Sequence, residues 1–285
     1  AAFVWLIVCT VYHYKGKADK PLKQNFCEFA PFAERSMNAA RQRLSFSPDK
    51  SRRLNKKDYI LMLAITVVYA AVAFINLGST NIPEPAAVLD HEGDSIVIEL
   101  SEESFIETMW HYAGYCEGYI EVSVSSDGEH YTLASESSEH EYADMFRWQP
   151  TIIASDAKYV KITLNSGYME FREIGFTDSN RSFLHNSSAK YIYADGSSSD
   201  ASAVIDEYDE LPHDGTSYMQ DMYFDEVYHA RTAYEYIHGI YPYEITHPPL
   251  GKAFIALGCM IFGFNPFGWS FMGTLAGVLM LPVLY

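Results

Sequence analysis

Hydrophobic positions follow three different patterns along this chain, and the first is an unbroken apolar run. Residues 59–77 (YILMLAITVVYAAVAFINL) hold 19 uncharged residues, close to the ~20 that span ~30 Å of hydrocarbon. We predict a transmembrane helix over residues 58–78, with a buried core helix as the alternative. The uncharged residues 253–285 divide at an Asn-Pro step into a short re-entrant or interfacial segment and a second spanning helix. Residues 1–13 read as a truncated membrane helix and not as a signal peptide, since no Met or charged region precedes them.

The second pattern is alternation of apolar and polar residues. It occurs in residues 95–100 (SIVIEL), 119–124 (YIEVSV) and 159–164 (YVKITL), and a further strand is predicted over residues 169–177 (MEFREIGFT). Short strands at this spacing predict an antiparallel β-sandwich over residues 82–178. The run resembles the discoidin, or galactose-binding-like, jelly rolls, a family that often binds sugars. A spacer or docking role and a glycan partner both stay open.

Polar and acidic residues without periodicity follow, and we predict a mobile linker over residues 179–222.

Charge is segregated in the same order. The chain carries 20 Lys+Arg and 37 Asp+Glu, and 12 of the bases lie in residues 15–57, whereas residues 78–224 hold 28 acids and six bases. This segregation excludes a single soluble domain and a nucleic-acid binder that uses the whole chain. By the positive-inside rule, the basic loop 14–57 is cytoplasmic and residues 79–252 are extracytoplasmic, in a multipass protein of the cell membrane. The lipid bilayer is therefore an expected partner, and nucleic acid is not.

The third pattern, helical spacing, appears in residues 223–252, the stretch that holds the candidate chemistry. Asp225 and Glu226 precede apolar residues at helical spacing, and Gly239 is placed to end the helix. The aromatic residues of this helix favour a position along the outer membrane surface. Acids at a helix start can simply complement the dipole. The same dipole would keep Asp225 ionised and able to accept a proton.

The segment THPPLGK (residues 246–252) adds candidate cations. A proline after His247 makes its backbone extended, and Pro249 can start the next helix. Lys252 then falls in the first turn, beside free backbone N–H groups that suit an anionic phosphate. A lysine that extends to lipid headgroups is an equal alternative. The four cysteines are scattered, which gives no disulfide framework and no zinc motif.

Together, YFDEVYHARTAYEYIHGIYPYEITHPPLGK and the following NPFGWSFMGTLAGVLMLPVLY resemble the protein O-mannosyltransferase family of polytopic type-C glycosyltransferases. The resemblance covers roughly residues 59–80 and 223–285. It implies transfer of a sugar, mannose by preference, from a polyprenyl-phosphate donor to Ser/Thr hydroxyls of a protein acceptor. It also implies that Asp225 is the catalytic base or positions the acceptor, with Glu226 in support. His247 and Lys252 would lie near the donor phosphate, with Arg231 as a secondary phosphate ligand.

The expected fold class is thus an α+β membrane protein, multipass, with the jelly roll inserted in the first outer loop, and the chain reads as a fragment that is inactive alone. No cofactor is implied. A metal is not expected either, although Asp225, Glu226 and His229 could form a ligand set. Two other functions stay open: a related transferase that acts on a lipid or cell-wall glycan, and a non-catalytic, membrane-anchored carbohydrate-binding protein.

Overall fold

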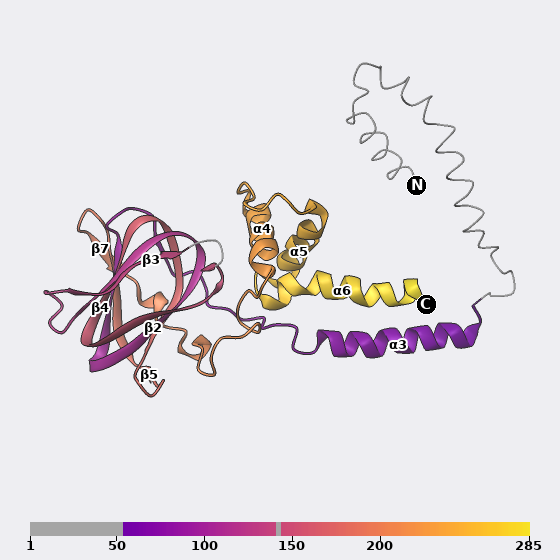
Figure 1. The fold of residues 1–285 in the computed structure, drawn as a ribbon, viewed down its shortest axis with the longest axis horizontal. Coiled ribbons are helices and arrows are strands. Elements are labelled where there is room, and N and C mark those ends of the chain that lie inside the picture. The colour runs from indigo at the N-terminus through magenta and orange to yellow at the C-terminus, as the bar shows by residue number, and fades with distance from the viewer. Residues whose placement is uncertain (1–53, 141–143) are drawn as a thin grey trace, which may run out of the picture. The chain divides into compact units, whose positions relative to one another are not determined.

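The computed structural model describes residues 54–140 and 144–285, and residues Ile60–Tyr285 form one compact unit. The described elements run from helix α3 through strands β1–β7 to helices α4–α6 (Figure 1). The predicted helix tail over residues 1–13 and nearly all of the basic loop over residues 14–57 lie outside the described residues.

Two of the described helices are long and apolar enough to cross a membrane, as judged by length and composition: α3 (Lys56–Phe74) and α6 (Pro266–Leu284). Helix α3 has no buried residue. An apolar helix whose side chains are not covered by the rest of the protein is better suited to lipid than to water. The predicted division before α6 is confirmed. Asn265 caps α6 by accepting a hydrogen bond from the Gly268 N–H at 2.8 Å, and Pro266 occupies the first turn.

Within the described residues, seven antiparallel strands form a single curled sheet (Figure 1). Their order is β1-β4-β2-β6-β7, with β3 paired to β2 and β5 paired to β4. The strands are β1 (Ala87–Leu89), β2 (Ser95–Ser125), β3 (Thr132–His140), β4 (Arg147–Thr177), β5 (Phe183–Leu184), β6 (Asn186–Ile192) and β7 (Ser198–Asp200).

The strands differ from the expected set of short strands, because β2 and β4 each run for 31 residues. The predicted strands over 95–100 and 119–124 are the two ends of β2, and those over 159–164 and 169–177 both lie in β4. Thr108 of β2 is paired with Ile152 and also with Thr177, at two distant points of β4, and the register shifts repeatedly around it. Such irregularities bend a strand, so the sheet folds over its own apolar face instead of forming separate short strands.

The sheet also extends into the region for which the sequence predicts a linker. Strand β6 pairs with β2 from Ser95 opposite Ile192 to Leu100 opposite Asn186. Only Ala189 and Tyr191 of β6 are buried. A strand buried on one face needs apolar residues only at alternate positions. In β6 only two such positions are buried, so the sequence of this segment is mostly polar and does not show the alternation that predicts a strand. Short 3₁₀ turns follow at Ser202–Val204 and Tyr208–Glu210.

The curled sheet packs against the helical residues that contain the candidate chemistry. The ring of Phe146, just before β4, lies 5.0 Å from that of Tyr234 on α4 (Glu226–His238) and 4.6 Å from that of Phe264. Tyr115 of β2 stacks on the same Tyr234 at 5.7 Å. These aromatic contacts fix one side of α4 against the sheet.

Candidate functional site

The acid pair stands at the start of α4, as the sequence predicts. Asp225 is exposed, and its carboxylate makes no capping hydrogen bond to the helix. Glu226 is half-buried: it accepts a hydrogen bond from the Tyr223 N–H at 2.8 Å and one from the Ser270 hydroxyl at 3.3 Å. Burial raises the pKa of Glu226. The two neighbouring carboxyl groups therefore differ, one free and open to water, the other held and partly desolvated.

Both acids line a cavity of about 550 Å³ together with His229. Its opposite wall comes from the end of α3 and the start of α6, with the lining residues Ala73, Ile75, Asn76, Leu77, Trp269, Ser270, Gly273 and Thr274. The cavity thus joins carboxylates to apolar side chains of the two helices that are long enough to cross a membrane. A ligand with a polar head and an apolar tail matches this lining.

Glu244 is the centre of a second group of polar contacts. Its carboxylate accepts from the ammonium of Lys252 and from the Thr246 hydroxyl, and from the Thr246 N–H at 2.6 Å. The imidazole Nδ1 of His247 lies 3.2 Å from Glu244 Oε2. The bond from Lys252 is the main cause that holds the pKa of Glu244 well below its ordinary value.

Lys252 is held inside the fold by the ion pair of its side chain with Glu244. It lies in the first turn of α5 (Pro249–Phe262), whose start at Pro249 confirms the prediction. Its side chain is only 3% exposed, and Nζ also donates to the Glu244 carbonyl. The ammonium thus closes the 244–252 loop onto α5, and Lys252 is not among the residues that line the cavity. His247 keeps a side chain that is 60% exposed.

The two histidines meet beside this group. The rings of His229 and His247 lie 5.0 Å apart at 88°. His229 Nδ1 is buried and has no hydrogen-bond partner. Burial lowers the pKa of His229, and the charges of His247 and Lys252 lower it further, which favours the neutral form of this imidazole. One ligand atom each from His229, Glu244 and His247 lie within 4.8 Å of one another, which makes them a possible metal-binding set.

Arg231 is placed away from these groups. Its guanidinium Nε donates to Glu235 Oε1 at 2.8 Å, and both side chains are at most 3% exposed. The guanidinium also lies over the ring of Tyr243 at 4.4 Å, and the Tyr243 N–H donates to the other oxygen of Glu235 at 3.0 Å. Arg231 is not among the residues that line the cavity.

Sequence reasoning missed Glu244 altogether and weighed His229 only as a metal ligand with the acid pair. A signal for Glu244 existed: a lone acid three residues before His247 and eight before Lys252. Spacing alone does not show that the intervening loop turns back, so the contact was not foreseen. Gly239, in contrast, ends α4 with a φ of 68°, as predicted.

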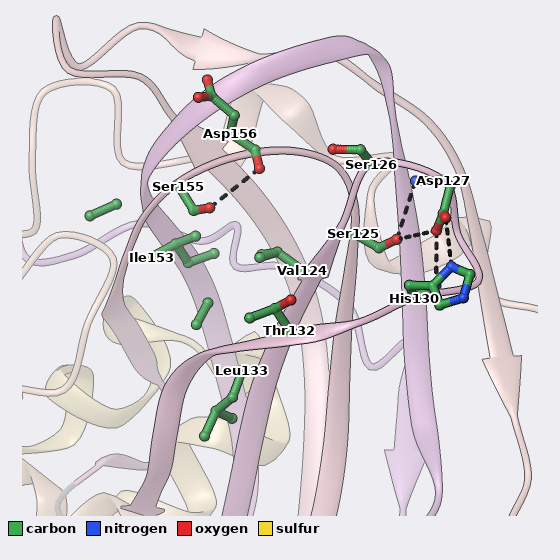
Figure 2. A pocket seen from close by; sticks show the side chains of 12 residues that line it. Val124, Ser125, Ser126, Asp127, His130, Thr132, Leu133, Ile153, Ser155 and Asp156 are labelled. Carbon is green, nitrogen blue, oxygen red and sulfur yellow. Dashed lines mark hydrogen bonds and ion pairs between the residues drawn. The ribbon is translucent and has the colours of Figure 1, made fainter.

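A second cavity, of about 540 Å³, lies on the curled sheet (Figure 2). Its polar residues include Ser125, Asp127, His130 and Ser155, and Ile153 and Leu133 add apolar surface. Figure 2 shows Asp127 directed at its own neighbours: it accepts from Ser125 at 2.9 Å and lies 2.8 Å from His130 Nδ1. These bonds stabilise the turn at residues 126–128, and they occupy both carboxylate oxygens of Asp127.

Comparisons with known proteins add to this geometry. No family model matches the chain. It is 40% identical over 67 residues to the polyprenol-phosphate-mannose–protein mannosyltransferase of Mycobacterium tuberculosis H37Rv and 38% identical over 67 residues to that of Mycolicibacterium smegmatis mc(2)155. Each match covers 21% of this chain and 13% of the relative. Part of this chain is similar to mannosyltransferases. The chain spans only that 13% of the relatives' length.

Solved structures give a different set of neighbours. A pectin-binding carbohydrate-binding module covers 37% of this chain and 80% of its own at 19% identity, with a TM-score of 0.29. An F5/8 type C domain from Bacteroides fragilis covers 33% of this chain and 74% of its own at 15% identity, with a TM-score of 0.27.

Proposed function

We propose that this chain belongs to a membrane glycosyltransferase that moves a sugar, by preference mannose, from a polyprenyl-phosphate donor to Ser/Thr hydroxyls of a protein. The observation that carries the proposal is the cavity in which Asp225 and Glu226 face the apolar ends of α3 and α6. It suits a donor with a polar sugar phosphate and a lipid tail. The partial identity to mannosyltransferases supports the same reaction.

The topology belongs to the proposal too. With residues 14–57 on the cytoplasmic side, residues 79–252 lie outside, where cytosolic nucleotide sugars are absent. A donor carried across the membrane on lipid would then reach the cavity from the bilayer, and the acceptor hydroxyl would reach it from water. Asp225 is exposed and can meet such an acceptor.

In this reaction Asp225 takes the proton of the acceptor hydroxyl while the oxygen of that hydroxyl forms a bond to sugar C1. The bond from C1 to the phosphate oxygen breaks, and its electron pair leaves with the polyprenyl phosphate. Glu226 supports Asp225 from its half-buried position. The exposed His247 would face the phosphate, and Lys252 would act through Glu244, whose position it holds. Arg231 would act indirectly, because its ion pair with Glu235 stabilises α4.

The test uses membranes that contain the protein at its natural length, supplied with polyprenyl-phosphate-[³H]mannose and a Ser/Thr-rich peptide. Asp225→Asn should lower the rate of peptide labelling by a factor of at least ~10² if the carboxylate is the general base. Asp209→Asn, at an exposed acid outside the cavity, should leave labelling unchanged and serves as the matched control.

Other outcomes point to the alternatives. Label found only in lipid or glycan fractions would favour a transferase with a different acceptor. No label in any fraction, together with sugar binding that persists in Asp225→Asn, would contradict the proposal that the protein is an enzyme. It would favour a membrane-anchored carbohydrate-binding protein that uses the cavity on the sheet (Figure 2).

A further inference from the structure

The contacts of His229, Glu244 and His247 point to a metal site different from the Asp225, Glu226 and His229 set that the sequence allows. Their ligand atoms come from two separate places: His229 from the first turn of α4, and Glu244 and His247 from the loop before α5. A set of two imidazoles and one carboxylate is the ligand type that zinc takes in many catalytic sites, with a further position left open.

The separations agree with a shared ion. His247 Nδ1 lies 3.2 Å from Glu244 Oε2. Two atoms that each bind one tetrahedral zinc at ~2.1 Å are roughly 3.4 Å apart. The His229 ring stands at 88° to that of His247, with centroids at 5.0 Å, so the two rings can present nitrogens to a common point without stacking.

His229 supplies an independent observation. Its Nδ1 is buried and has no hydrogen-bond partner, an arrangement that costs free energy unless another group satisfies the atom. An imidazole nitrogen that makes no hydrogen bond within the protein is available to bind a metal.

The remaining contacts of Glu244 would hold its carboxylate in place as a ligand of such an ion. Carboxylates that bind metals commonly accept hydrogen bonds from outer groups, which orient them. Thr246 donates to Oε1, and Lys252 donates to Oε2. The positive charge of Lys252 lowers the affinity for any cation, whereas the nearby Asp225 and Glu226 raise it. This balance favours an ion with strong imidazole bonds over Mg²⁺ or Ca²⁺, which prefer oxygen ligands.

We propose that His229, His247 and Glu244 bind one zinc ion at the edge of the cavity. Since His229 also lines the cavity, the open position of the ion would be available to an anionic oxygen of a ligand bound there. Zinc binding itself does not depend on the proposed transfer reaction, so the two can fail separately.

The test measures zinc without turnover. The full 285-residue chain, purified in detergent and stripped with a chelator, is titrated with ZnCl₂ and followed by calorimetry, with zinc content measured by mass spectrometry after gel filtration. We expect one zinc per chain. His247→Ala, at an exposed side chain, should weaken binding at least tenfold, and His229→Ala should do the same.

His91→Ala is the control, because His91 belongs to the separate group Asp90, His91 and Asp94. It should leave the zinc content unchanged. Circular dichroism of each variant establishes that it folds. The proposal is overturned if the unaltered chain retains no zinc, or if folded His229→Ala and His247→Ala bind zinc as the unaltered chain does. Loss of zinc in His91→Ala alone would place the ion at the other group and equally overturn it.

Discussion

Arg231 and Glu235 lie one turn apart on α4, and both side chains are at most 3% exposed. The pair is surrounded by the ring of Tyr243 and, at 5.6 Å, that of Tyr115. Taking either charge out of water is costly, and only the partner and the added hydrogen bonds offset that cost. Removing one member of the pair would therefore leave the other as an uncompensated buried charge and destabilise the fold.

Arg231→Met should destabilise the protein by about 3–5 kcal/mol, because it leaves Glu235 buried and unpaired. The double variant Arg231→Met/Glu235→Leu should recover much of this loss. Chemical denaturation in mild detergent measures both. Lys158→Ala is the control, since its partner Glu99 at 3.2 Å is about one-third exposed, and a surface pair contributes ~0–1 kcal/mol. Equal losses in Arg231→Met and Lys158→Ala would contradict the assignment.

At the scale of elements, β4 is joined to the 3₁₀ segment over residues 202–210 by a buried acid. Glu173 is 1% exposed and accepts a hydrogen bond from the Glu207 N–H at 3.2 Å. Burial, with the nearby charges of Glu207 and Asp206, raises the pKa of Glu173 to about 8. The folded state thus holds a proton that the unfolded chain releases near the ordinary value of 4.5.

The stability of this junction should therefore fall as pH rises. The contribution of Glu173 is fully present below about pH 4.5 and is lost as pH rises through about 8, since the unfolded chain binds fewer protons over that interval. Thermal unfolding of the protein between pH 5 and pH 8.5 measures this. Glu173→Gln should remove most of the slope, and Asp209→Asn, at an exposed acid nearby, should keep it. A slope that Glu173→Gln leaves unchanged would show that another group titrates.

At the scale of the whole unit, the curled sheet and the candidate site are joined by aromatic side chains. Phe146 is fully buried between Tyr234 and Phe264, and the guanidinium of Arg172 lies 5.3 Å from its ring. The Phe146 carbonyl also accepts from the Met222 N–H at 3.2 Å, three residues before Asp225. The sheet therefore supports the start of α4 and does more than separate it from α3.

Phe146→Ala should destabilise the protein by about 3–5 kcal/mol, since it opens a cavity between sheet and helix. Amide hydrogens of residues 226–238 should then exchange faster. Hydrogen–deuterium exchange with mass spectrometry reports both regions at once. Phe105→Ala, at a β2 side chain that is 40% exposed, should change neither. Faster exchange confined to the sheet would show that α4 holds its position without it.

The sequence determined the local features that depend on neighbouring residues alone. The apolar runs that became α3 and α6, the αL glycine that ends α4 and the proline that starts α5 all follow from the conformational preferences of a few adjacent residues. The acid pair at the start of α4 was equally predictable. These features need no knowledge of distant contacts.

Only the tertiary structure decided how these pieces meet. The sequence left a phosphate or lipid headgroups as equal alternatives for Lys252 and did not show that the 244–252 loop turns back so that Lys252 pairs with Glu244. Arg231 is likewise buried with Glu235, and β6 joins the sheet within a stretch that reads as a linker. The partner of a charged side chain depends on the path of the chain in space. That path is set by burial of apolar surface between distant segments, which spacing along the sequence does not reveal.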